Sequence, residues 1–327
     1  MVGHEGQIIL NYLQRWGNPT SLALLNPLCK IFYKPELDGI LGYRDSSHCA
    51  VVFGDPICAQ EIMPALIRDF HQDCFEKNKK IIYASVSESY MRWAIDNVCE
   101  LAIEIGKEVI INPLFDLTAQ TGQYAHLLRQ KKNDAQRNNV TIQEYHGDDQ
   151  YVEQSMKKVA HNWLQHRKGL QIYLLPLDLF ANRLGKRWFY AQQNGKIIGL
   201  LTINRLDKYN GWVLNGGLMV DASAPKSTTE AMVLEVINQL RHEECNFFSI
   251  GTLPSERVGY IEGAGRLSQW MASGMFSMAQ KIFKFSDRQR YWKKFKPFLE
   301  PRFILFDKRS IGIQQIMAVM RAFNVNF

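Results

Sequence analysis

The stretch GLMVDASAPKSTTEAM, residues 217–232, joins the end of an apolar run to a polar loop with a proline and then to a helix-like segment. Gly216 and Gly217 lie within the apolar run. Paired glycines weaken a strand unless they form a bulge or let a ligand approach the backbone, and the sequence leaves both alternatives open. The loop has no glycine, so it lacks the residues with which a diphosphate loop gathers several amides around one anion.

The helix after this loop has two interpretations. Ser227 or Thr228 can cap it, and Glu230 can close a capping box. Free amides at its N-terminus, with Lys226 just outside, suit a phosphate or a carboxylate. An ordinary capped helix on the surface is the alternative.

Similar strand-like and helix-like segments alternate along the rest of the chain. Strands are predicted at residues 48–56, 79–87, 211–220, 247–254 and 301–307, as two short strands around Gly106 (100–113), and as a hairpin around Asn194-Gly195 (188–206). Helices are predicted at residues 59–78, 87–98, 122–140, 227–246 and 311–323, and at 151–169 with Gly169 as its end. This order predicts an α/β or α+β fold with crossovers, with one domain at residues 1–150 and a second at residues 151–327 that carries the site.

Composition narrows the class of protein. The chain of 327 residues is 46% apolar and can bury a large core, and its net charge of +7 favours an anionic partner. Six cysteines without a Cys-x-x-Cys pair indicate reduced core thiols. The first 25 residues lack a signal-peptide pattern, and no run of about 18 apolar residues occurs. We therefore expect a cytoplasmic protein whose contact with lipid, if it has one, is peripheral at the membrane.

The basic charge is concentrated in KIFKFSDRQRYWKKFKPFLEPR, residues 281–302, where eight Lys or Arg stand against two acids. The interleaved aromatic residues can stack on unpaired bases, lie at a lipid interface, or turn into the core behind a basic rim. They are Phe283, Phe285, Tyr291, Trp292, Phe295 and Phe298. A second basic segment, RQKKNDAQR (129–137), has the pattern of a solvated helix face. The residues expected to contact an anionic partner are Arg129, Lys131, Lys132, Arg290, Lys293 and Lys296.

The sequence has no nucleophile motif such as G-x-S-x-G and no H-E-x-x-H metal motif, and its eight histidines are dispersed. An enzyme of this composition would position a preactivated acyl group and an external nucleophile, with the proton handled by a Lys, a Glu or water. We expect no cofactor and no metal.

The motifs FGDP, IGKEVIINPLFDL, LLRQKKN, NWLQHRKG, GLM, DASAP, TEAM, FFSIGTLPS and KKFKPFLEPRFI follow one another over about residues 48–306. This ordered set resembles the soluble catalytic domain of the phosphatidylglycerol lysyltransferase family, as a free-standing member without the transmembrane flippase domain. The resemblance implies tandem GNAT-like (acetyltransferase-type) folds. It also implies an aminoacyltransferase that moves an amino acid from aminoacyl-tRNA to a lipid or to another hydroxyl or amine acceptor. A tRNA partner would explain the basic, aromatic segment.

The resemblance also implies roles for residues. Lys294 and Arg302 would stabilise developing charge or the tRNA end, and Glu230 would shape the pocket or move a proton. The expected substrate-binding residues are Gly216, Gly217, Met219, Lys226, Gly251, Arg167 and Glu300.

The chain departs from the family pattern at two motifs. Gly217 and Val220 stand where the lysyltransferases carry Asp and Arg, and Trp292 replaces one lysine of their Phe-Lys-x-Lys-Phe motif. The amino acid and the acceptor therefore stay open. Two other functions also stay open: an acyl-CoA-dependent GNAT N-acyltransferase, which the glycine-free loop disfavours, and a catalytically silent protein that binds tRNA or an anionic membrane.

Overall fold

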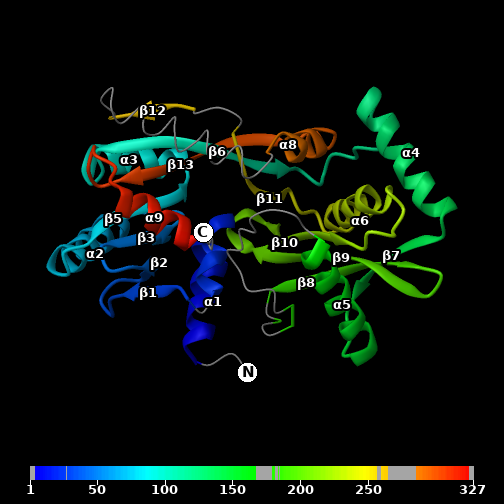
Figure 1. Cartoon of the computed structure of the whole chain (residues 1–327), viewed down its shortest axis with the longest axis horizontal. Coiled ribbons are helices and arrows are strands. Elements are labelled where there is room, and N and C mark those ends of the chain that lie inside the picture. Colours follow the sequence, from blue (N-terminus) through cyan, green and yellow to red (C-terminus); the bar gives the residue numbers. More distant parts are fainter. Residues whose placement is uncertain are drawn as a thin grey trace.

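The computed structural model describes residues 4–26, 28–166, 179–180, 183, 185–255, 259–263 and 285–323. The described strands form one mixed sheet with helices on both of its faces (Figure 1). The strand order is β1-β2-β3-β5-β13-β6-β11-β10-β9-β8-β7, with β4 paired to β2 and β12 paired to β6. The predicted mixed α/β fold is confirmed.

The bounds of the elements follow the chain. The strands are β1 (Lys30–Tyr33), β2 (Gly39–Asp45), β3 (Cys49–Phe53), β4 (Ile57–Cys58), β5 (Lys80–Val86), β6 (Leu101–Ile111), β7 (Val140–Tyr145), β8 (Lys186–Gln193), β9 (Lys196–Leu206), β10 (Gly211–Val220), β11 (Phe247–Pro254), β12 (Ile261–Glu262) and β13 (Phe298–Phe306). The helices are α1 (His4–Trp16), α2 (Met63–Glu76), α3 (Glu88–Asn97), α4 (Gln123–Arg137), α5 (Gln150–His166), α6 (Thr228–His242), α8 (Phe285–Lys293) and α9 (Ile313–Ala322), with 3₁₀ turns η1 (Pro19–Leu25) and η2 (Asp207–Tyr209).

One structural unit occurs twice. In each half a strand, a helix and a second strand form a parallel pair: β3-α2-β5 in the first half and β10-α6-β11 in the second. In the first half α3 follows the unit, and in the second half α8 follows it after β12; each helix is then followed by a strand that lies beside the other half. Thus β6 pairs with β11 and β13, whereas β13 pairs with β5 and β6. Figure 1 shows β13 alongside β6 in the upper part of the view. This repetition agrees with the tandem arrangement that the sequence resemblance implies.

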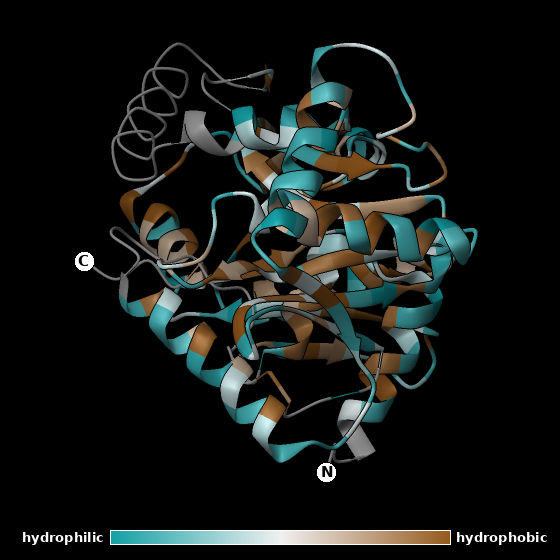
Figure 2. Cartoon of the chain, turned by 90° about the vertical axis from the view of Figure 1, so that its right-hand side faces the viewer, coloured by the Kyte–Doolittle hydropathy of each residue, from teal (hydrophilic) through white to brown (hydrophobic). Residues whose placement is uncertain are grey.

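The core follows the two halves. In the first half, α2 and α3 pack on one face of the strands, and α1, η1 and α9 pack on the other. In the second half, α4 and α6 cover one face and α5 covers the other. Figure 2 shows hydrophobic strands between helices whose outer faces are hydrophilic. The tail helix α9 therefore packs on β3 and β5, while α4 and β7, which precede residue 150, pack with the second half. The domain boundary at residue 150 stays a prediction.

The local predictions succeeded where short-range signals decide the structure. The Asn194-Gly195 hairpin is confirmed, with φ of +49° and +80°. The two short strands expected around Gly106 are wrong, because β6 runs without a break through this residue. A Cβ at Gly106 would lie 2.4 Å from the Leu253 carbonyl oxygen, so the glycine permits close packing of β11 rather than a turn. The predicted end of the fifth helix at Gly169 lies outside the described residues, and the described part of α5 ends at His166.

Candidate functional site between two diverging strands

The two parallel pairs differ in length. In the first half, all of β3 (Cys49–Phe53) pairs with β5. In the second half, β10 pairs with β11 at residues 211–213 and 247–249, and the described residues show no further pairing between the two strands. Beyond this point β10 pairs with β9 and β11 pairs with β6. Beyond residues 213 and 249 the two strands therefore diverge, and the Gly251 N–H in this stretch donates to Ser249 Oγ at 2.9 Å.

Glycine bulges lie where the strands diverge. Gly216 and Gly217 have φ of +72° and +99°, and the register of β10 against β9 shifts between Asn215 and Leu218. Gly251 has φ of +92°, with a shift in β11 against β6. A Cβ at Gly217 would meet Trp163 at 3.9 Å, an ordinary contact, so the backbone conformation and not lack of space requires glycine. A bulge, one of the two alternatives that the sequence left open for Gly216-Gly217, is present.

A buried carboxylate lies on the neighbouring strand β6. Glu108 is fully buried, and its cross-strand partners are Thr252 of β11 and Glu300 of β13. The hydroxyl of Ser249 donates a hydrogen bond to Glu108 Oε1, and the hydroxyl of Thr252 donates one to Oε2 at 3.0 Å. Arg302 Nε lies 3.6 Å from the same Oε2. Three strands, β6, β11 and β13, thus meet at one carboxylate, which we call the Glu108 cluster (Glu108, Ser249, Thr252, Glu300 and Arg302).

Arg302 lies between two carboxylates of different exposure. Its Nη2 donates to Glu300 Oε2 at 3.3 Å, while Nε faces Glu108. The side chain of Arg302 is 8% exposed and that of Glu300 is 57% exposed. Burial raises the pKa of Glu108, against the opposing effects of Arg302 and the two hydroxyl donors. The cluster therefore offers an oriented guanidinium and one solvent-accessible carboxylate.

Hydroxyl groups extend this cluster to the first half. Ser85 Oγ lies 3.0 Å from Thr252 Oγ1 and 3.1 Å from Thr20 Oγ1. Ser85 has φ of +61° and interrupts the register of β5 against β13, as Ile250 interrupts that of β11 against β6. Tyr209 stacks on Phe247, two residues before Ser249, with 4.5 Å between the ring centroids. Burial, together with Asp55, raises the pKa of Tyr209 to about 12 against the opposing effect of Arg302. The cluster thus lies at the junction of the two halves.

A second charged group lies at the start of α6. Lys294 forms a buried ion pair with Glu230, and its Nζ lies 3.9 Å from the centre of the Tyr291 ring. Thr229 Oγ1 donates to Glu230 Oε2 at 2.8 Å. The predicted capping by Ser227 and the capping box are wrong: Ser227 has helical φ and ψ, and α6 has no side-chain cap. The Glu230 side chain is held by Lys294, a partner 64 residues away.

The two charged groups lie on opposite faces of the sheet. Phe248 packs in the core that contains α6, whereas the next residue, Ser249, points to the other face and contacts Glu108. Glu230 lies in the first turn of α6, which follows the end of β10. The diverging ends of β10 and β11 thus have the Lys294–Glu230 ion pair on one face of the sheet and the Glu108 cluster on the other.

Part of the predicted anion surface is brought together. Arg129 Nη1 donates to the carbonyls of Thr118 at 2.6 Å and Gln120 at 3.0 Å, and Lys296 Nζ donates to Gln120 Oε1 at 2.5 Å. Arg129 of α4 and Lys296, which follows α8, thus contact the same loop. Of the other predicted anion contacts, Lys132, Arg290 and Lys293 are exposed and Lys131 is half-buried.

Other sequence predictions need correction. Trp292 and Phe295 are 8% and 0% exposed and pack in the core of the second half. For these two residues the structure therefore selects the core alternative over stacking on bases. Met219 is 1% exposed and packs beneath α5, which removes it from any substrate surface. Lys226 is exposed on the loop before α6. Arg167 lies outside the described residues.

Sequence reasoning missed Glu108, Ser249 and Thr252. The available signal was an acid inside the apolar stretch EVII of β6, since a carboxylate at a buried strand position needs partners. Those partners come from β11 and β13 and are not visible locally.

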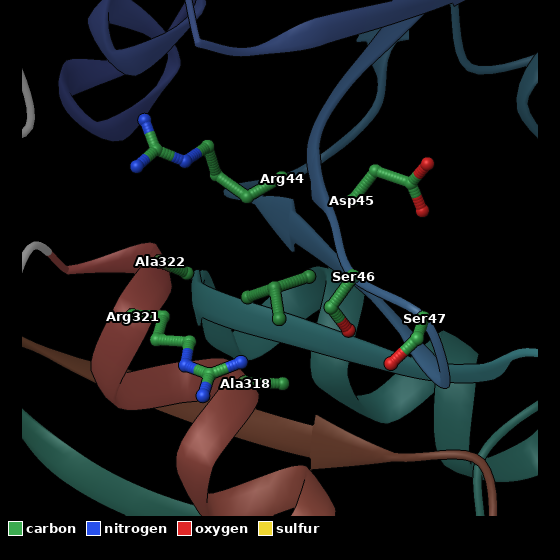
Figure 3. A pocket seen from close by; sticks show the side chains of 8 residues that line it. Arg44, Asp45, Ser46, Ser47, Ala318, Arg321 and Ala322 are labelled. Atoms are coloured by element: carbon green, nitrogen blue, oxygen red, sulfur yellow. The ribbon is translucent and has the colours of Figure 1, made fainter.

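A small cavity of about 210 Å³ lies elsewhere, between the β2–β3 turn and α9. Figure 3 shows the side chains of Arg44 and Asp45 extending in opposite directions there, with Ser46 and Arg321 across from each other. It shares no residue with the Glu108 cluster or the Lys294–Glu230 pair. Within the described ranges, no group of His, Cys, Asp or Glu is placed to hold a metal ion. No helix of the described chain is long and apolar enough to cross a membrane.

The fold and site define a class of α/β proteins in which a strand-helix-strand unit occurs twice. In the second unit, the parallel strands β10 and β11 diverge between two charged groups. Residues 11–306 match the family described as phosphatidylglycerol lysyltransferase, C-terminal, and the chain belongs to this family.

Individual relatives agree with this assignment. The chain is 23% identical over 304 residues to a phosphatidylglycerol lysyltransferase of Staphylococcus epidermidis, with 89% of this chain and 34% of the relative covered. The corresponding protein of Bacillus subtilis is 19% identical over 292 residues, with 88% and 33% covered. The chain therefore spans about a third of the length of these curated relatives. The solved structure of L-PGS from Bacillus licheniformis shares the fold, with a TM-score of 0.78, 17% identity and coverage of 98% and 96%.

Proposed function

We propose that the protein is an aminoacyltransferase that moves an amino acid from aminoacyl-tRNA to a hydroxyl or amine group of a lipid. The observation that carries this proposal is the opened β10–β11 pair in a chain of the lysyltransferase family. The relatives are named for transfer to phosphatidylglycerol, which makes a phospholipid hydroxyl the first acceptor to consider. We further propose that the second half, residues 151–327, supplies most of the site, and that the protein works in the cytoplasm at a membrane surface.

The reaction suits a site without a nucleophile triad. The acceptor oxygen or nitrogen attacks the carbonyl carbon of the aminoacyl ester, the bond from that carbon to the tRNA ribose oxygen breaks, and the proton passes from the acceptor to the ribose oxygen. No oxidant, reductant or cofactor is needed, because the ester is already activated. Alignment of the two substrates and stabilisation of the oxyanion then supply much of the rate enhancement.

The two faces suggest a separate approach for each substrate. A tRNA end that arrives along the basic segment of α4, which packs on α6, would meet the face with Lys294 and Glu230. The lipid headgroup would meet the Glu108 cluster on the other face, and the two would join where β10 and β11 diverge. Gly216 and Gly217, which lack side chains, would let the ester carbonyl approach the backbone of β10.

The side chains have distinct proposed roles. Arg302, fixed by Glu108 and Glu300, would stabilise the developing oxyanion or a lipid phosphate. Glu300 is exposed enough to accept a hydrogen bond from the α-ammonium of the amino acid. Glu108 is a positioning residue, since both of its oxygens are engaged within the protein. Lys294 and Glu230 would orient the tRNA end or manage the transferred proton.

The experiment is transfer from a panel of labelled aminoacyl-tRNAs to a total lipid extract by purified protein. We expect lipid-soluble label with at least one amino acid, and much less label with Glu300→Gln, which retains the shape of the side chain. No acceptor-dependent loss of label from any tRNA would overturn the proposal. Two further measurements address the alternatives. Thermal stabilisation by acetyl-CoA would favour an N-acyltransferase, and salt-sensitive tRNA binding without turnover would favour a silent binding protein.

A further inference from the structure

Exposed apolar side chains gather at the end of the sheet where β6 finishes and β13 begins. Leu114 and Phe115, just after β6, are 47% and 53% exposed, and Phe298 and Leu299, which open β13, are 58% and 54% exposed. Phe298 lies opposite Ile110 of β6, so the two pairs belong to adjoining segments. Large apolar side chains that gather on a surface mark interaction sites more often than single exposed ones do.

The loop that carries Leu114 and Phe115 is held in place by the protein itself. The backbone N–H of Leu114 donates to Asn112 Oδ1 at 3.0 Å, and that of Phe115 donates to the Asn112 carbonyl at 3.3 Å. The next residue, Asp116, forms an ion pair with Arg241 at 2.6 Å. Although burial opposes it, hydrogen bonding to Thr118 and Arg241 lowers the pKa of Asp116 to about 2. The loop therefore presents its apolar side chains from a fixed base.

The charge around these side chains is positive. Lys296 contacts Gln120 of the same loop, and Lys293 is exposed at the end of α8. Lys293 makes no ion pair with any residue that the structure describes. The nearby acids Asp116 and Glu300 are each paired with an arginine. An approaching surface would meet unpaired lysine charge beside exposed apolar groups.

We propose that this surface, the β6–β13 tip (Leu114, Phe115, Phe298 and Leu299, with Lys293 and Lys296), docks on an anionic lipid bilayer. Apolar side chains can enter the boundary between headgroups and acyl chains, while the lysines stay at the level of anionic headgroups. The inference rests on the proposed function, because a lipid acceptor must reach the site from a membrane. From Phe298 to Arg302 the strand advances four residues, about 13 Å at about 3.3 Å per residue, so docking brings the Glu108 cluster close to the headgroups.

The chemistry of the tip favours lipid over two other occupants. Two of its four apolar side chains are leucines, which offer no ring on which a nucleic-acid base could stack. Four apolar side chains are also few for a stable dimer of this chain, since such an interface takes about 20 to 30 residues on each side. Neither a nucleic acid nor a second copy of the chain would contact both the lysines and the apolar side chains as an anionic bilayer would.

The test is sedimentation of the purified chain with vesicles of phosphatidylglycerol and phosphatidylcholine, without tRNA. We expect salt-sensitive binding to these vesicles and weak binding to phosphatidylcholine alone. The variant Phe115→Ser/Phe298→Ser should bind at least roughly tenfold more weakly. The matched control is Phe75→Ser on α2, an exposed phenylalanine away from the tip, which should bind as the unchanged protein does. Leu114→Ser/Phe115→Ser, confined to the loop, repeats the test without altering β13.

Each contrary outcome is distinct. Equal vesicle binding by the unchanged protein and both tip variants would overturn the proposal. A dimer that forms without lipid and that the tip variants abolish would also overturn it. So would tRNA binding, measured without lipid, that the tip variants weaken as much as they weaken vesicle binding. The vesicle test measures binding and not turnover, so it is independent of the transfer assay. A protein that binds vesicles through the tip but transfers no amino acid in that assay would refute the proposed function and leave the docking surface supported.

Discussion

Replacement of Glu108 by alanine should be the most destabilising single change in the Glu108 cluster. The fully buried carboxylate accepts hydrogen bonds from Ser249 and Thr252 and faces the Arg302 guanidinium at 3.6 Å. Alanine would leave the hydroxyls of Ser249 and Thr252 without this acceptor. It would also leave the nearly buried guanidinium of Arg302 with Glu300 as its remaining carboxylate partner. Breaking a buried ion pair by removing one partner costs about 3–5 kcal/mol, and the hydrogen bonds belong to the same truncated group, so they are not added again. We therefore expect a loss of about 3–5 kcal/mol in the free energy of unfolding.

Equilibrium unfolding in urea measures this loss, provided that the slope of the transition stays unchanged. Glu300→Ala is the matched control, because Glu300 contacts the same guanidinium from an exposed position and should cost less than about 1 kcal/mol. If Glu108→Ala unfolds within about 1 kcal/mol of the unchanged protein, Glu108 does not hold the junction of the two halves together.

Three further outcomes follow from the same structure. Burial raises the folded-state pKa of Glu108 above its unfolded value, so the stability of the unchanged protein relative to Glu108→Gln should be greatest at low pH. It should fall as pH rises from the ordinary glutamate value of 4.5 through the folded pKa, which urea midpoints measured from below pH 4.5 upward can follow. Lys294→Met should cost about 3–5 kcal/mol by leaving Glu230 buried and unpaired, and adding Glu230→Gln should recover part of this in a double-mutant cycle. Gly217→Ala should cost about 1–2 kcal/mol because of its φ of +99°, whereas Gly147→Ala, without a positive φ, should be near neutral in thermal unfolding.

The sequence predicted those parts of the fold that short-range chemistry decides. The Asn194-Gly195 turn, the apolar strands and the Gly216-Gly217 bulge depend on residues close in the chain, and each is present. The prediction of a break in β6 was wrong because Gly106 is required by the close approach of the Leu253 carbonyl on β11, not by a turn. The exchange of β6 and β13 between the halves depends on pairing over some 200 residues, which no local pattern reveals.

The site followed the same division. Arg302 and Glu300 were found because they lie in a family motif, but their buried partner Glu108 was not, since it lies on another strand. The capping box at Ser227 was a sound local expectation that lost to a tertiary contact, the ion pair of Glu230 with Lys294. The aromatic residues near Lys293 divided by burial: Trp292 fills the core and Phe298 is exposed.

The most direct test of the proposed transfer is mass spectrometry of the lipids of cells with and without this protein. An aminoacyltransferase that acts on lipid predicts new species whose masses equal a cellular lipid plus one aminoacyl group, present only when the protein is made. Identical lipid profiles in cells that contain the folded protein at high level would contradict transfer to a lipid.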